Sequence, residues 1–119
     1  MLKAIYTTEG DPKAFLEYPN LFNEAGEWVG FVTPQRDVYS VSGIYVGVLT
    51  DDPRIIRRKF EEPKPQLTPP EKPASIRIPA VIPLPGMMRD LPLGNIDILQ
   101  EEPYRLHTVD MIDYRKDFD

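Results

Sequence analysis

The chain of 119 residues lacks cysteine altogether and contains a single histidine, His107. Without cysteine, neither a disulfide framework nor a thiolate metal site can form, and one histidine is too few for the usual zinc sites. Nucleophilic catalysis needs a nucleophile, a base and an orienting acid, and no recognisable motif of that kind surrounds His107. We therefore expect no enzyme, no metal site and no cofactor.

The sequence also lacks any long apolar run. No stretch approaches the ~20 apolar residues that a membrane-spanning helix needs, and the N-terminal residues contain no apolar segment of signal-peptide length. A phosphate-binding loop is missing as well, because the pairs Gly26/Gly30 and Gly43/Gly47 lack the lysine and the following helix that such a loop requires. These features predict a cytoplasmic protein with no transmembrane segment, and leave peripheral contact with a membrane complex open.

A short unit occurs three times in residues 5–50, aligned on Gly10, Gly26 and Gly43. Glycine adopts the positive φ of a tight turn without a Cβ clash, and the flanking residues are the β-branched and aromatic types that favour strands. Each unit therefore predicts a β-hairpin. Four positions before each glycine stands an aromatic residue and four after it a small one: Tyr6, Phe22 and Tyr39, then Ala14, Gly30 and Gly47.

A fourth unit begins at Arg54-Ile55-Ile56-Arg57, in register with Val38-Tyr39, but its turn glycine would fall near Phe60 and is absent. The sequence predicts a mostly β fold, in which three and a half repeated hairpins form a small β-roll or flower-like head. Tyr6, Phe22, Tyr39 and Ile56 should occupy equivalent places. A single hairpin cannot bury its apolar face, so the copies must pack together. The last half-unit should leave an edge to which another chain, or this chain's own tail, adds a strand.

The unit Val38-Tyr39-Ser40-Val41-Ser42-Gly43-Ile44-Tyr45-Val46-Gly47-Val48-Leu49 resembles the repeat of the bacterial four-fold β-flower domain. The resemblance covers roughly residues 4–60. It implies four hairpins followed by a proline-rich, often basic tail, and the truncated fourth hairpin departs from that pattern. It implies no activity, so no residue takes a role from it.

Proline is abundant instead, with 14 residues, ten of them between Pro63 and Pro103. We predict a hairpin domain in residues 1–59, an extended linker of polyproline type in 60–75 and an apolar, acidic arm in 76–119. The arm is too apolar for ordinary disorder, while its prolines prevent a long helix or a central strand. We therefore expect the arm to lie along another surface, with Ile76-Arg77-Ile78 and Ile96-Asp97-Ile98 as short edge strands.

Charge is uneven: residues 1–53 have a net charge of −5, residues 54–77 of +4 and residues 78–119 of −4. The basic stretch is either a solvated connector or a docking site for an acidic partner. Nucleic acid is not expected, because the hairpin half is acidic whereas a nucleic-acid groove is basic. Near the C-terminus, Met111, Tyr114 and Phe118 either share one face of a short helix or belong to an irregular acidic end.

The resulting functional hypothesis is a non-catalytic interaction or scaffold protein, an accessory subunit that binds other protein subunits or a second copy of itself. The alternative is a small peptide- or ligand-binding module that uses the aromatic face around Trp28, Tyr39 and Tyr45, which requires Trp28 to be partly exposed. The residues predicted to contact a partner are apolar residues of the arm and basic residues of the fourth unit: Ile76, Ile78, Val81, Ile82, Leu84, Met87, Met88, Ile96, Ile98, Arg54, Arg57 and Arg58.

Overall fold

A computed structural model of the chain describes residues 2–110. The predicted face of Met111, Tyr114 and Phe118 lies outside the described residues. The described chain forms one curled antiparallel sheet in which each strand pairs with the next along the sequence, and the mostly β fold is thereby confirmed. Its eight strands are β1 (Lys3–Tyr6), β2 (Pro12–Glu17), β3 (Asn20–Phe22), β4 (Trp28–Val32), β5 (Asp37–Ser40), β6 (Tyr45–Leu49), β7 (Ile55–Arg58) and β8 (Asn95–Asp97).

The first three hairpins are structural copies of one another. Their turn glycines all have positive φ, between 80° and 95°. In each hairpin the aromatic residue before the turn follows a register shift and pairs across it, for example Phe22 with Trp28 and Tyr39 with Tyr45. Tyr6, Phe22 and Tyr39 are all buried. The sixteen- and seventeen-residue periodicity therefore reflects equivalent positions in the fold, as predicted.

The fourth hairpin is complete: of the two expected occupants of its edge, the chain's own tail is the one found, and the unit is not truncated. Strand β8 pairs antiparallel with β7, with Ile56 opposite Asp97 and Arg58 opposite Asn95. Gly94 precedes β8 with a φ of 80°, as the other turn glycines precede β2, β4 and β6. The chain's own tail thus supplies the missing strand, and the tip of this hairpin is expanded into the loop of residues 59–94.

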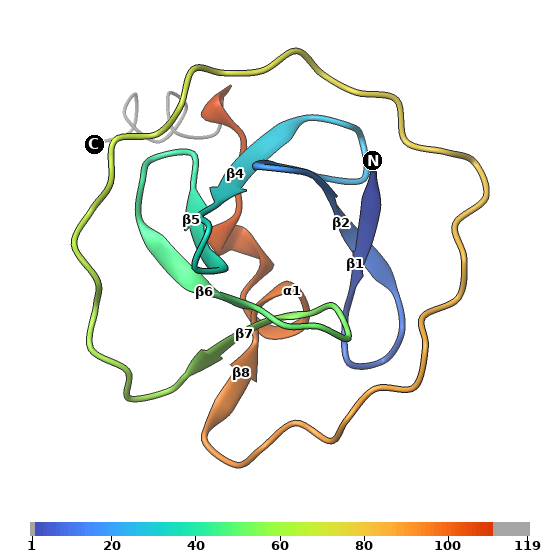
Figure 1. The fold of residues 1–119 in the computed structure, drawn as a ribbon, viewed down its shortest axis with the longest axis vertical. Helices are drawn as coiled ribbons and strands as arrows, with labels where there is room; N and C mark the ends of the chain where they lie inside the picture. The colour runs from blue at the N-terminus through green and yellow to red at the C-terminus, as the bar shows by residue number, and fades with distance from the viewer. Residues whose placement is uncertain (1, 111–119) are drawn as a thin grey trace.

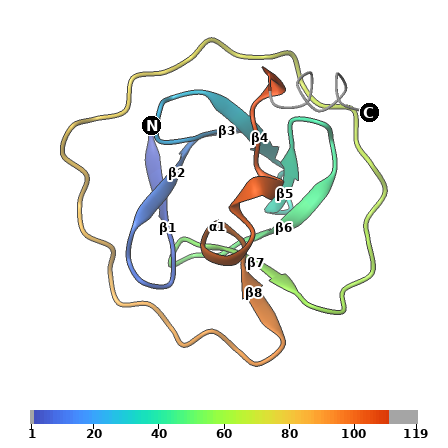
Figure 2. The ribbon, with the colours of Figure 1, turned by 180° about the vertical axis from the view of Figure 1, so that it is seen from behind.

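This loop, which we call the belt, runs around the outside of the other three hairpins before it returns as β8 (Figure 1 and Figure 2). The segment expected as a linker and the first part of the arm therefore lie against the chain's own head. Residues 61–93 contain no strand, and after β8 come α1 (Ile98–Glu101) and the 3-10 helix η1 (Pro103–Arg105).

The main core lies at the centre of the ring of hairpins. Ile5, Leu21, Val38 and Ile55, one from the same place in each repeat, are fully buried there. Helix α1 covers this centre on one face of the molecule, as Figure 2 shows, and inserts Ile98 into the same cluster. The C-terminal segment therefore completes the core, because four small hairpins alone leave their inward aliphatic side chains open on that side.

Polar contacts join the fourth hairpin to the first and close the ring. The backbone N–H of Tyr6 donates to the carbonyl of Pro53 (3.1 Å). Asp97, fully buried, accepts hydrogen bonds from the backbone N–H and the hydroxyl of Thr8 at 2.7 and 2.6 Å. The guanidinium of Arg54 donates to the same hydroxyl (3.0 Å). A buried carboxylate is stable only when it is bonded in this way. This junction between the first and fourth hairpins, which we call the seam, therefore depends on these partners.

Within residues 2–110, none of the helices is long and apolar enough to cross a membrane, and no group of acidic or histidine side chains is arranged to hold a metal ion.

Candidate functional site

The belt touches the tips of the other hairpins at their turn glycines. The backbone N–H of Leu67 donates to the carbonyl of Gly43, and that of Ile76 donates to the carbonyl of Gly26, both at 2.9 Å. At each place the belt carbonyl lies where a glycine Cβ would stand, 1.8 Å from that position at Gly43 and 1.9 Å at Gly26. Glycine is therefore required at these two positions for two reasons: the positive φ of the turn and the close approach of the belt backbone.

The third tip is met by a side chain, since the Cγ of Pro85 lies 3.5 Å from the Cβ position of Gly10. The contact residues Leu67, Ile76 and Pro85 are nine residues apart. Nine residues of polyproline-type chain span ~28 Å at about 3.1 Å per residue, the chord of a quarter circle of radius ~20 Å. The described chain is 41 × 37 Å across its two longer axes, so one interval of the belt matches one quarter of the ring.

A polar cluster holds the first part of the belt against the third hairpin. The Lys64 ammonium lies 3.0 Å from both carboxylate oxygens of Asp37 and 4.9 Å from the centre of the Tyr45 ring. The hydrogen bond to Asp37 raises the pKa of Lys64. Burial, followed by the charge and hydrogen bond of Glu61, raises the pKa of Tyr45. The basic stretch is thus partly neutralised by the chain's own acidic head.

Two backbone carbonyls anchor the later part of the belt. The Tyr6 hydroxyl donates to the carbonyl of Pro83 at 2.6 Å, and Arg54 donates to the carbonyl of Arg89 at 2.9 Å. Arg54 also bonds the Asp52 carboxylate at 2.6 Å. Burial opposes the charge on Asp52, but hydrogen bonds from Arg54 and the Thr50 hydroxyl outweigh it and lower the pKa of Asp52. The head therefore contacts the belt at several places between Lys64 and Arg89.

From Pro73 to Leu91, the belt is partly buried at almost every third residue, which is the period of a polyproline II helix. Ile76, for example, packs against the buried cluster of Phe22, Trp28 and Val41. The one exception is position 79, where Pro79 is exposed and Ile78 is partly buried instead, just before a bend in the chain at residue 80; the same period continues from Ile82. We call the partly buried residues that follow this period the inner row: Pro73, Ile76, Ile82, Pro85, Met88 and Leu91.

Apolar side chains also point away from the head, again at intervals of three. Val81 is 86% exposed, Leu84 91%, Met87 99% and Leu93 102%, with Asp90 at the intervening place. We call these four residues the outer stripe. Singly exposed apolar residues are ordinary, but a contiguous series of large ones marks an interaction site. The outer stripe contributes nothing to the packing of the described chain, so its apolar character is unexplained by the fold.

The structure distributes the predicted contact residues between its interior and this surface. Val81, Leu84 and Met87 lie in the outer stripe, whereas Ile82, Met88 and Ile76 lie in the inner row. Ile78 is partly buried. The stripe residue Leu93 was not among the predicted ones, although its spacing from Met87 by two periods of three is visible in the sequence.

The predicted edge-strand and basic residues are mostly engaged inside the chain. Ile96 in β8 and Ile98 in α1 are buried in the main core. Arg54 is 2% exposed. Arg57 binds Glu102 at 3.0 Å, and Arg58 is exposed. Only Arg58 of the three arginines is open to a partner, so the basic stretch does not form one exposed patch.

The aromatic residues of the hairpins do not form an exposed face. Trp28, expected to be partly exposed for a ligand-binding face, is only 5% exposed and packs with Phe22. Tyr39 stacks on Phe31 with ring centres 5.5 Å apart, and Tyr45 meets it edge-on at 5.8 Å. Both tyrosines are buried, so these rings hold neighbouring hairpins together.

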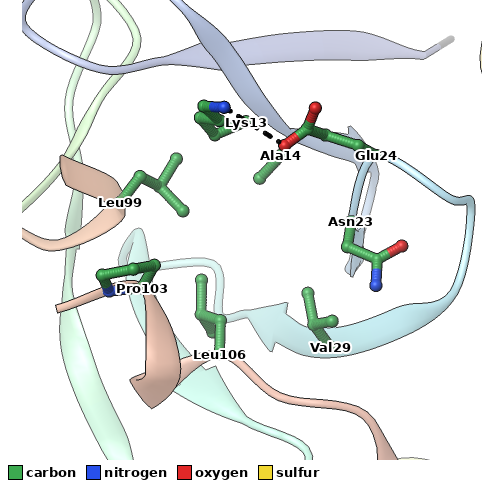
Figure 3. A pocket seen from close by; sticks show the side chains of 8 residues that line it. All are labelled: Lys13, Ala14, Asn23, Glu24, Val29, Leu99, Pro103 and Leu106. Atoms are coloured by element: carbon green, nitrogen blue, oxygen red, sulfur yellow. Dashed lines mark ion pairs between the residues drawn. The ribbon is translucent and has the colours of Figure 1, made fainter.

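A cavity of about 300 Å³ lies between the first two hairpins and the C-terminal segment (Figure 3). Its apolar wall includes Leu99 and Leu106, and an ion pair between Lys13 and Glu24 (3.5 Å) spans its rim. The side-chain oxygen of Asn23, which also lines the cavity, already accepts hydrogen bonds from the backbone N–H groups of Ala25 and Glu27 in the same turn. Because these polar groups already have partners within the chain, the cavity offers no convergent set of groups for chemistry or for specific recognition.

A sequence model of the family described as "4-fold beta flower protein" matches residues 3–90. The match thus spans the first seven strands and most of the belt, the parts in which the repeat and its encircling loop occur. No curated protein and no solved structure matches the chain.

Proposed function

The chain belongs to the 4-fold beta flower protein family. That membership assigns no function, and from the exposed apolar residues of the belt we propose that the chain is a non-catalytic protein–protein interaction protein, a scaffold or accessory subunit of a larger assembly. The head and belt form the rigid body, and a partner protein docks on the outer stripe. A cytoplasmic location belongs to the same proposal.

The outer stripe is the observation that supports this proposal. Val81, Leu84 and Met87 each leave more than four fifths of their surface in water, at a hydrophobic cost of roughly 1.5–3 kcal/mol per side chain relative to burial. The belt could satisfy its contacts to the head with polar residues at these places, because they do not face the head. A binding partner that covers them supplies the missing burial.

The proposal is tested with the full chain carrying an affinity tag, recovered from cells that naturally produce it. The variant Val81→Ser/Leu84→Ser/Met87→Ser removes three stripe residues. The control variant Ile44→Ser/Phe60→Ser/Tyr104→Ser removes three exposed apolar residues scattered elsewhere, which are 54%, 95% and 58% exposed. Trp28 fluorescence checks that both variants fold.

We expect the stripe variant to lose at least about tenfold of a stoichiometric partner, as truncation of an interface centre does, while the control variant keeps it. The proposal is wrong if both variants recover the same proteins in the same amounts, or if the unmodified chain recovers no stoichiometric partner.

A further inference from the structure

Resting on the proposed function, we infer that the partner binds the outer stripe as a preformed polyproline-type ligand. The binding site on the partner is a concave groove lined by aromatic side chains, with acidic side chains at its rim. Four properties of the belt lead to this partner chemistry: its free faces, its backbone, its shape and its charge.

Two of the three faces of the belt are open. In a three-residue period the inner row occupies one column, the outer stripe a second, and exposed residues such as Arg77, Pro83 and Arg89 a third. Grooves that recognise polyproline segments take up two columns and leave the third outside. Here the head occupies the column that such a groove leaves unused.

The backbone of the stripe region suits a partner that donates hydrogen bonds. Pro79, Pro83, Pro85 and Pro92 have no N–H, so a strand cannot pair along this segment without losing ladder bonds. The carbonyl oxygens of Pro83, Arg89, Pro92 and Leu93 already accept hydrogen bonds within the chain, and the other carbonyls between them remain as acceptors. Aromatic grooves for polyproline ligands meet this need, because the indole N–H and the phenolic hydroxyl both donate from an apolar wall.

The shape of the site favours a concave partner. The belt is the outermost part of the ring in both views of the molecule (Figure 1 and Figure 2), so the stripe forms a convex ridge. Two such ridges from two copies of the chain touch along a narrow line, whereas a stable interface buries about 800 Å² per partner. A groove encloses the ridge and reaches that area.

Charge and rigidity add to the argument. The exposed Arg77 and Arg89 lie in the column beside the stripe, which matches acidic residues on a groove rim. The belt is also held by the bonds from Tyr6 to Pro83 and from Arg54 to Arg89. The chain has therefore already ordered the ligand segment, and binding costs less conformational entropy than with a free peptide.

The test places a photo-crosslinking amino acid, p-benzoylphenylalanine, at position 84 of the full chain in cells that naturally produce it. Mass spectrometry then maps the crosslinked residues on the partner. We expect them to lie in a groove that contains several Trp, Tyr or Phe side chains with Asp or Glu at its rim. Crosslinks to a second copy of the chain, to lipid or to a partner surface without aromatic residues overturn the inference, as does the absence of any crosslink.

A second variant separates recognition of the polyproline form from recognition of apolar area. Pro79→Ala/Pro83→Ala keeps the stripe and keeps the carbonyl that accepts from Tyr6, but relaxes the backbone. We expect its crosslink yield at position 84 to fall about fivefold or more, while the control Pro63→Ala/Pro65→Ala, elsewhere in the belt, leaves the yield unchanged. An unchanged crosslink yield in Pro79→Ala/Pro83→Ala refutes the polyproline recognition and leaves the proposed function standing. If the Val81→Ser/Leu84→Ser/Met87→Ser variant recovers the partner as well as the unmodified chain in the affinity experiment, both the proposed function and this inference are wrong.

Discussion

The contact between the belt and the hairpin tips can be tested with four glycine-to-alanine substitutions. Gly10, Gly26, Gly43 and Gly94 all have φ between 80° and 95°, so alanine at any of them adopts the strained left-handed conformation, at about 1 kcal/mol. Only at Gly26 and Gly43 would the added Cβ overlap the belt. At Gly94 nothing lies within 4 Å of the added Cβ, and at Gly10 the nearest belt atom is at an ordinary contact distance.

At Gly26 the added Cβ would stand 1.9 Å from the carbonyl oxygen of Ile76, which no side-chain rotation relieves. The belt must move away from the tip. It then loses the hydrogen bond from Ile76, worth about 1 kcal/mol, and part of the burial of that side chain on Phe22 and Trp28, worth about another 1 kcal/mol. Gly26→Ala should therefore lower the free energy of unfolding by about 3 kcal/mol, against about 1 kcal/mol for Gly94→Ala.

Urea denaturation followed by Trp28 fluorescence measures these values, with Gly43→Ala expected near Gly26→Ala and Gly10→Ala near Gly94→Ala. Trypsin cleavage after the exposed Arg77 reports the belt itself. Lost contacts of about 2 kcal/mol raise the population of the displaced belt about thirtyfold, and the cleavage rate with it. Equal destabilisation by all four substitutions, or unchanged cleavage in Gly26→Ala, would show that the belt does not rest on the tips.

Three further results are expected. Asp97→Ala leaves the hydrogen bonds of the seam without their buried acceptor and should cost about 3 kcal/mol in urea denaturation, whereas the exposed Asp90→Ala should change stability by less than about 0.5 kcal/mol; similar small effects of both would contradict the seam. The pKa of Asp52 is lowered on folding, so the stability it contributes is present above its ordinary value of 3.8 and is lost as the pH falls through the lower folded pKa. Stability measured against pH should fall less steeply below pH ~4 in Asp52→Asn than in the unmodified chain, and parallel curves would exclude this contribution. Trp28 is buried, so iodide should quench its fluorescence only after unfolding, and ready quenching of the folded chain would restore the aromatic face as a binding surface.

The hairpin head was predictable because its information is local. A turn glycine with strand-forming residues on both sides specifies a hairpin within about a dozen residues, and the repeat of Gly10, Gly26 and Gly43 gave three independent instances. The fourth hairpin was predicted only in part: the added strand from the chain's own tail was among the expected alternatives, but the unit was taken as truncated because the belt separates its two halves. Gly94 has the same conformation as the other three, but it lies far outside the sixteen- or seventeen-residue interval, and nothing near Phe60 indicates where the partner strand resumes.

Whether the basic residues are exposed or engaged within the chain was not predictable from charge alone. In the sequence, Arg54 and Arg57 belong to a basic stretch that was predicted to be exposed. In the structure, Arg54 is bonded to Asp52 and Thr8, and Arg57 is bonded to Glu102. Those partners come from the first hairpin and the C-terminal segment as well as from neighbouring sequence. Only the folded ring brings them together, so composition gave the sign of the charge and not its exposure.

The outer stripe, by contrast, is visible in the sequence, but at a period of neither a helix nor a strand. Val81, Leu84, Met87 and Leu93 follow a period of three, while helices and strands are sought at 3.6 and two. Prolines within the same segment already exclude both of those forms, which leaves the three-residue period as the one consistent with the chain. Two apolar columns at that period cannot both face a single head. A head that buries one of them must therefore leave the other exposed, as it does the outer stripe.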